Sequence, residues 1–197
     1  MIARHAMKLA PLFLLLAAAC GPAGSNGPAA PAAPPIPKVE PGHFIHRGGG
    51  SRQFDALVSG TDITGPTINL TLYSDSSERA IRGQVSGLTV DVEISGNRAH
   101  GLVGPTPLDV TVTRKDQKIH VDGVVRGAPT DFDFGPDVLD GKIGNCTYHL
   151  TQTGKPSYNG SRGCGGGATV EVEVPEALRV WGDAELAATL GLMLSAP

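Results

Sequence analysis

The 197-residue chain has few aromatic side chains, few charges and no excess of basic residues. Aromatic residues make up 5 % of it, which is too little for the stacking platforms that bind single-stranded nucleic acid. Sixteen Lys and Arg residues stand against nineteen Asp and Glu, so the net charge is −3 and no surface for a polyanion is expected. The composition therefore argues against a nucleic-acid partner.

The sequence also lacks the short motifs that mark common catalytic and cofactor sites. It contains no serine on a G-x-S-x-G turn, no phosphate-binding loop, no dinucleotide-binding fingerprint and no C-x-x-C pair. We therefore expect a non-catalytic protein without a cofactor, and we keep an enzyme of unrecognised type as a third hypothesis.

Long hydrophobic runs are scarce as well. The apolar stretch from Leu9 to Ala19 is about 11 residues long, whereas a membrane-spanning helix needs roughly 20. It follows the basic residues Arg4 and Lys8 and ends in three alanines, which is the pattern of a signal peptide. We assign residues 1–19 to this signal and expect the protein to be exported.

The end of the signal has a further feature. Leu16-Ala17-Ala18-Ala19-Cys20-Gly21 resembles the lipobox of bacterial lipoproteins, and the resemblance covers this segment alone. It implies that Cys20 is acylated, with palmitate among the acyl chains, and that the protein is held at a membrane of the cell envelope by this lipid. Gly21 differs from the aspartate that retains such proteins at the inner membrane, so the resemblance favours the outer membrane.

Residues 20–42 read as a tether between the lipid and a folded domain. Six prolines lie among alanines between Gly21 and Lys38, and Ile36 is the large apolar side chain there. Such a segment buries little surface and is expected to be extended. The folded domain is accordingly placed at residues 43–197.

This domain contains a repeat of about 20 residues, in which a pair of glycines precedes a strand of alternating apolar and polar residues. The second glycines of the pairs are Gly65, Gly87, Gly104, Gly127, Gly144 and Gly163. A unit of this length accommodates two strands and two turns, so each unit predicts a β-hairpin. We predict a mainly β fold: an antiparallel meander of about 10–12 strands that curls into a sheet or barrel-like roll.

A short helix is predicted at residues 184–194, with Asp183 as its N-cap. Leu186, Leu190 and Leu194 recur at helical spacing, and alanines make the segment apolar on nearly every side. A helix of this kind is normally buried. We expect it to pack on or inside the curled sheet, with Trp181 hidden nearby.

Two cysteines remain if Cys20 carries lipid. A turn at Thr153–Pro156 would place Cys146 opposite Cys164 on adjacent strands, within disulfide distance. An exported protein meets an oxidising compartment in which such a bond persists. We predict the Cys146–Cys164 disulfide.

Four histidines are candidate metal ligands: His43 and His46 beside the tether, and His100 and His120 on predicted strands. The predicted register places Thr111 opposite both His100 and His120, so that the two imidazoles lie in one row about 10 Å apart. This separation is long for a shared metal, which binds imidazole at about 2 Å. We therefore favour solvent-exposed strand histidines and predict no metal site.

Acidic residues recur at one position of the repeat, at Asp91, Asp109, Asp131 and Glu171. Such a column usually keeps a sheet soluble and deters edge pairing, and a cationic partner is the alternative.

Three hypotheses for function follow. The first is a lipid-anchored envelope protein whose non-catalytic β-domain has a structural role or binds an envelope protein. The second is a carrier that holds a small apolar ligand inside the curled sheet. The third is the enzyme. An internal cavity of several hundred Å³ would favour the carrier, and an interior filled by the helix would favour the first hypothesis.

Overall fold

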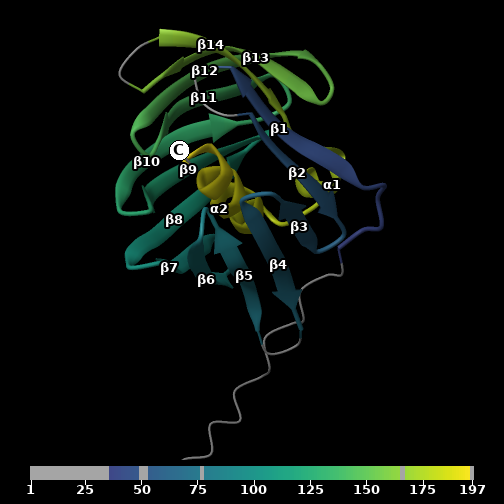
Figure 1. The fold of residues 1–197 in the computed structure, drawn as a ribbon, viewed down its shortest axis with the longest axis vertical. Helices are drawn as coiled ribbons and strands as arrows, with labels where there is room; N and C mark the ends of the chain where they lie inside the picture. The colour runs from purple at the N-terminus through teal and green to yellow at the C-terminus, as the bar shows by residue number, and fades with distance from the viewer. Residues whose placement is uncertain (1–35, 49–52, 76–77, 165–166, 196–197) are drawn as a thin grey trace, which may run out of the picture. The chain divides into compact units, whose positions relative to one another are not determined.

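The computed structural model describes residues 36–48, 53–75, 78–164 and 167–195, which form a closed antiparallel barrel around one helix (Figure 1). The predicted signal peptide, Cys20 and the tether up to residue 35 lie outside the described residues. Ile36 and Val39 pack against the core of the barrel, so the end of the predicted tether belongs to the folded domain.

Each strand of the barrel is hydrogen-bonded to the strands before and after it in the sequence, and the last strand pairs with the first. The described strands are β1 (Gly42–Gly48), β2 (Phe54–Ser59), β3 (Asp62–Gly65), β4 (Ile68–Ser74), β5 (Arg79–Val85), β6 (Leu88–Ser95), β7 (Arg98–Val103), β8 (Thr106–Lys115), β9 (Lys118–Val125), β10 (Ala128–Phe134), β11 (Val138–Ile143), β12 (Cys146–Gly154), β13 (Ser157–Gly163) and β14 (Gly167–Glu173). The predicted meander of hairpins is confirmed, with 14 strands in the described residues in place of about 10–12.

Strand β1 shows why the sequence count was too low. The sequence analysis placed His43–His46 at the start of the folded domain without predicting a strand there, but the segment lies in β1 and closes the barrel. Ile45 pairs with Glu173 of β14 on one side and with Asp55 of β2 on the other. Phe44, within the same segment, is fully buried. Closure removes the exposed sheet edges that an open meander would leave for aggregation.

Glycines within the strands allow the sheet to bend sharply. Gly83 in β5 and Gly123 in β9 have φ angles of +140° and +145°, which side-chain-bearing residues rarely adopt. A Cβ atom would overlap the carbonyl oxygen of Asn69 at Gly83, and that of Asp109 at Gly123. Glycine is therefore required at these positions, where the neighbouring strand approaches the backbone closely.

The interior of the barrel is occupied by α2 (Asp183–Leu194), which follows the single-turn α1 (Glu176–Arg179) (Figure 1). All residues of α2 from Ala184 to Leu194 are buried. A helix that is apolar all round needs surroundings of this kind. Gly191 lets the helix approach β9 closely, because a Cβ there would crowd Val125. The buried helix that the sequence predicted is confirmed.

The start of α2 differs from the prediction. Gly182 is the N-cap and Asp183 is the first helical residue, so Asp183 does not cap the helix with its side chain. Its carboxylate instead forms an ion pair with Arg114 of β8. A carboxylate in the first turn also interacts favourably with the helix dipole.

The opposite end of α2 is bound through its carbonyl groups. The hydroxyl of Tyr148 in β12 donates to the carbonyl of Leu194 over 2.8 Å, and Arg126 donates to the carbonyl of Ser195 over 3.3 Å. The last carbonyls of a helix have no partner within the helix, so these donors satisfy groups that would otherwise be buried unpaired.

The predicted disulfide is present. Cys146 and Cys164 are bonded, with 4.4 Å between their Cα atoms, and the pairing of Thr147 with Gly163 is the register that the sequence predicted. Trp181 is also hidden as expected: it is 3 % exposed, and its indole N–H donates to the carbonyl of Gly60. Neither helix in the described part of the chain has the length and apolar content needed to cross a membrane.

Candidate functional site

Three of the candidate metal-binding histidines lie on the outer face, each beside a carboxylate of a neighbouring strand. Nδ1 of His43 lies 2.7 Å from Asp55, and Nδ1 of His120 lies 2.9 Å from Asp133. His100 is the looser case, with Nε2 3.5 Å from Glu93. Among the described residues no three His, Cys, Asp or Glu side chains gather closely enough to hold a metal ion.

The predicted row of His100 and His120 is wrong. His100 pairs with Asp109 and His120 pairs with Thr113, so each predicted pairing with Thr111 is displaced by two residues. The cause is the tightness of the turns. The hairpin between β8 and β9 reverses at Asp116, where φ is +56°, and β8 therefore runs on to Lys115.

His46 differs from the other histidines because it faces the interior. It is 6 % exposed, and its ring lies 6.3 Å from that of Tyr148 in an edge-to-face arrangement. Burial, and then the positive charge of Arg162, lower the pKa of His46 to about 4. It is therefore uncharged at neutral pH. Burial also raises the pKa of Tyr148 to about 12, so its hydroxyl keeps the proton it donates to the helix.

The recurring acidic residues are largely paired across strands. Arg98 donates to Asp109 through Nε and Nη2, and Arg82 donates to Asp91 over 3.1 Å. Arg47 lies 3.5 Å from Glu171. Opposite charges facing each other on one side of a sheet stabilise the strand pairing. The column is thus a set of cross-strand ion pairs more than an open site for a cationic partner.

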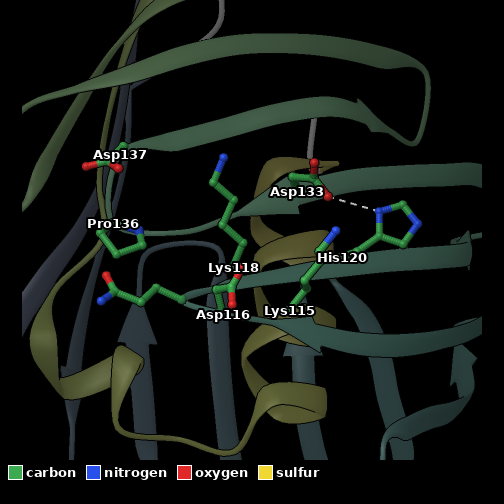
Figure 2. Close-up of a pocket in the computed structure, with 8 residues that line it drawn as sticks. Lys115, Asp116, Lys118, His120, Asp133, Pro136 and Asp137 are labelled. Atoms are coloured by element: carbon green, nitrogen blue, oxygen red, sulfur yellow. Dashed lines mark hydrogen bonds and ion pairs between the residues drawn. The ribbon is translucent and has the colours of Figure 1, made fainter.

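The outer face has a polar groove of about 670 Å³ at the end of the barrel where α2 begins (Figure 2). The turn between β8 and β9 forms one wall, and the segment that joins β10 to β11 forms the other. Lining side chains carry both signs of charge and include the His120–Asp133 pair. They are Lys115, Asp116, Gln117, Lys118, His120, Asp133, Pro136 and Asp137.

The chemistry of this groove is that of charged and hydrogen-bonding side chains. His120 is hydrogen-bonded to Asp133 among the lining residues. Two lysines and three aspartates offer ion pairs to a partner. The groove was not predicted from the sequence, although the hairpin order places the turns at residues 116 and 135 at the same end of the sheet.

Comparison with known proteins adds no family to this description: no family model, curated protein or solved structure matches the chain. The structure itself defines the class of fold, an antiparallel closed barrel filled by its own C-terminal helix.

Proposed function

We propose that the chain is an exported, lipid-anchored protein of the cell envelope, attached through Cys20, whose barrel binds a partner protein and is not catalytic. The lipobox resemblance and the proline-rich tether support the anchor. The Cys146–Cys164 disulfide is in keeping with an oxidising compartment outside the cytoplasm.

One observation carries the choice of an interaction domain over a carrier: the interior is already full. Leu186, Leu190 and Leu194 are buried among the inward-facing strand residues, where a carrier would hold its apolar ligand. Each such leucine contributes about 1.5–3 kcal/mol by leaving water. Expelling α2 to admit a ligand would forfeit several of these contributions at once, so we place the function on the outside.

The polar groove is the outer surface that we assign to the partner. Its charges lie on two hairpins of the barrel, the β8–β9 turn and the segment between β10 and β11. Lys115 and Lys118 would pair with carboxylates of the partner, and Asp137 with a basic side chain. An interface of this composition should weaken as the ionic strength rises.

The anchor is tested by metabolic labelling of the native host with a palmitate analogue. The parent chain should be labelled and should sediment with outer-membrane vesicles, while Cys20→Ala should lose the label. An unlabelled parent would contradict the anchor and leave the assignment of the barrel to be tested separately.

The role of the barrel is tested by site-specific photo-crosslinking in the native host. A photoreactive residue at Gln117, in the groove, should give a discrete adduct that disappears in the Lys115→Glu, Lys118→Glu double variant. The same probe at Gln84, an exposed position outside the groove, serves as the control, with Lys142→Glu as the control substitution. Equal adducts at Gln117 and Gln84, or native mass spectra with a retained apolar ligand, would contradict the proposal.

A further inference from the structure

We propose that the end of the barrel where α2 terminates contains a binding site for a small oxyanion, a carboxylate or phosphate group, centred on Arg162. This site is separate from the polar groove and does not depend on the lipid anchor or on a protein partner.

Arg162 is a buried cation with few partners. It points inward from β13, is 8 % exposed, and lies opposite Tyr148 in the strand register. Its Nη2 lies 3.4 Å from Sγ of Cys146, and its guanidinium lies 5.7 Å from the centre of the Tyr148 ring. Nε is buried and has no hydrogen-bond partner. Sulfur is a weak acceptor, and the Tyr148 hydroxyl is a second partner of the guanidinium, so Nε is the buried donor left without an acceptor.

The chain supplies no carboxylate side chain to Arg162. All nineteen Asp and Glu residues lie within the described ranges, and none forms an ion pair with it. Buried charges in proteins are usually paired, because removing an ion from water is costly. An anion from solution would provide the missing counter-charge.

A cavity of about 390 Å³ gives such an anion access to Arg162. Its lining consists of Val125, Arg126, Ala128, Gly144, Asn145, Cys146, Arg162 and Ser195. Two of these side chains are positively charged and none is acidic, so the cavity favours negative charge. The guanidinium of Arg162 fits an oxyanion in particular, since its planar array of N–H groups matches two oxygens of a carboxylate or phosphate.

The backbone at Arg126 provides a separate indication. Arg126 and Gly127 form the turn between β9 and β10, with φ angles of +53° and +75°. Turns with two positive φ angles prefer Asn, Asp or Gly, and an arginine gains nothing from this conformation. Its side chain reaches the cavity and the carbonyl of Ser195, which places a second cation beside Arg162.

Isothermal titration calorimetry of the full chain, purified in detergent, tests the site with sodium phosphate and with sodium acetate. Sodium chloride at the same ionic strength is the reference. We expect saturable binding of one phosphate or acetate per chain, and the two titrations distinguish a phosphate site from a carboxylate site. Arg162→Met should weaken binding at least tenfold, while Arg98→Met, which removes an exposed arginine of a surface ion pair, should leave it unchanged.

Binding that is no tighter than that of chloride, or that survives Arg162→Met, would overturn the proposal. NMR of the parent chain gives an answer even if that variant fails to fold. Phosphate or acetate should shift the Nε–H resonance of Arg162 and the amide of Asn145 more than the Nε–H resonance of Arg98. Unchanged Arg162 and Asn145 resonances at saturating anion would equally exclude the site.

Discussion

The two ends of the barrel differ in whether a buried charged side chain has a partner of opposite charge. Where α2 begins, Arg79 forms an ion pair with Glu185, whose side chain is 2 % exposed, and Arg114 pairs with Asp183. Where α2 ends, Arg162 is buried and forms no ion pair with an Asp or Glu side chain of the described residues. At the first end the charged side chains are paired with one another, and we interpret these ion pairs as structural. The second is complete only with a group from solution, which is the kind of arrangement expected of a binding site.

The largest effect is expected from breaking the paired end. Burial raises the pKa of Glu185, while a backbone hydrogen bond and then the positive charge of Arg79 lower it, so Arg79 favours the charged carboxylate in the interior. Arg79→Met should destabilise the fold by about 3–5 kcal/mol at pH 8, because one charge of the pair stays buried alone. The loss should be smaller at pH 4.5 than at pH 8, since protonation removes the buried negative charge of Glu185.

Urea denaturation of the parent and of Arg79→Met, at pH 8 and at pH 4.5, measures the loss in the free energy of unfolding. Arg98→Met is the matched control, since an exposed ion pair such as Arg98–Asp109 contributes little to stability. If the Arg79 and Arg98 variants lose equal stability, the ion pair with Glu185 does not hold that end of the barrel.

The end of the barrel where α2 terminates contains the Cys146–Cys164 disulfide. The Cys146–Cys164 bond closes a loop with a sequence separation of 18, for which the chain-entropy model gives about 3 kcal/mol. The double variant Cys146→Ala, Cys164→Ala should lose about this much in urea denaturation. Amides of Asn145 and Gly163 should also exchange with solvent faster, while those of Arg79 and Arg114 should not. Uniformly faster exchange would show that the disulfide does not act on one end.

The prediction of fold from sequence succeeded where local patterns decide the structure. Glycine pairs mark the units of the repeat, and strict alternation separates Val90 and Val92, which are buried, from Asp91, which is exposed. The pairing of Cys146 with Cys164 followed from one short turn. Each of these inferences spans no more than a hairpin, so little error could accumulate.

The prediction failed where contacts depend on turn geometry or on distant residues. The row of His100 and His120 required two turns to be placed correctly, and each was displaced by one residue, which moved both pairings. The contact of Glu185 with Arg79 requires knowledge of where the helix lies inside the barrel. The pairing of Arg162 with Tyr148 belongs to the same hairpin as the disulfide and follows from its register. Nothing in the local sequence of β1 indicated that it closes the barrel against β14.

A pH effect should distinguish the two ends further. The pKa of His46 is about 4 in the folded chain and about 6.5 when exposed, so the unfolded state binds more protons between these values. Stability from this residue is therefore fully present above pH 6.5 and is lost as the pH falls toward 4. The loss should be on the order of 2–3 kcal/mol, since one pKa unit corresponds to about 1.4 kcal/mol.

Comparing the parent with His46→Phe isolates the contribution of His46 protonation to stability, because the phenyl ring has a similar shape and does not titrate. Between pH 7 and pH 4.5 the parent should lose more stability in urea than the variant. Glu185 contributes with the opposite sign in both proteins and cancels in the comparison. Parallel pH profiles would mean that His46 is protonated in the folded barrel without cost.

The smallest and most discriminating effect is expected at Arg162 in the absence of oxyanions. Replacing a buried, unpaired cation by an apolar side chain of similar length removes a desolvation penalty, so Arg162→Met should be as stable as the parent or about 1 kcal/mol more stable in chloride buffer. Phosphate or acetate should then stabilise the parent and not the variant, because a ligand stabilises only the state that binds it. Arg79→Met is expected to lower stability, whereas Arg162→Met is not. The comparison therefore distinguishes an arginine that binds a ligand from one that stabilises the fold. A loss of about 3 kcal/mol or more in chloride, with no response to either anion in the parent, would place Arg162 with the structural residues. Both ends of the barrel would then be structural, one through ion pairs and the other through Arg162 and the disulfide.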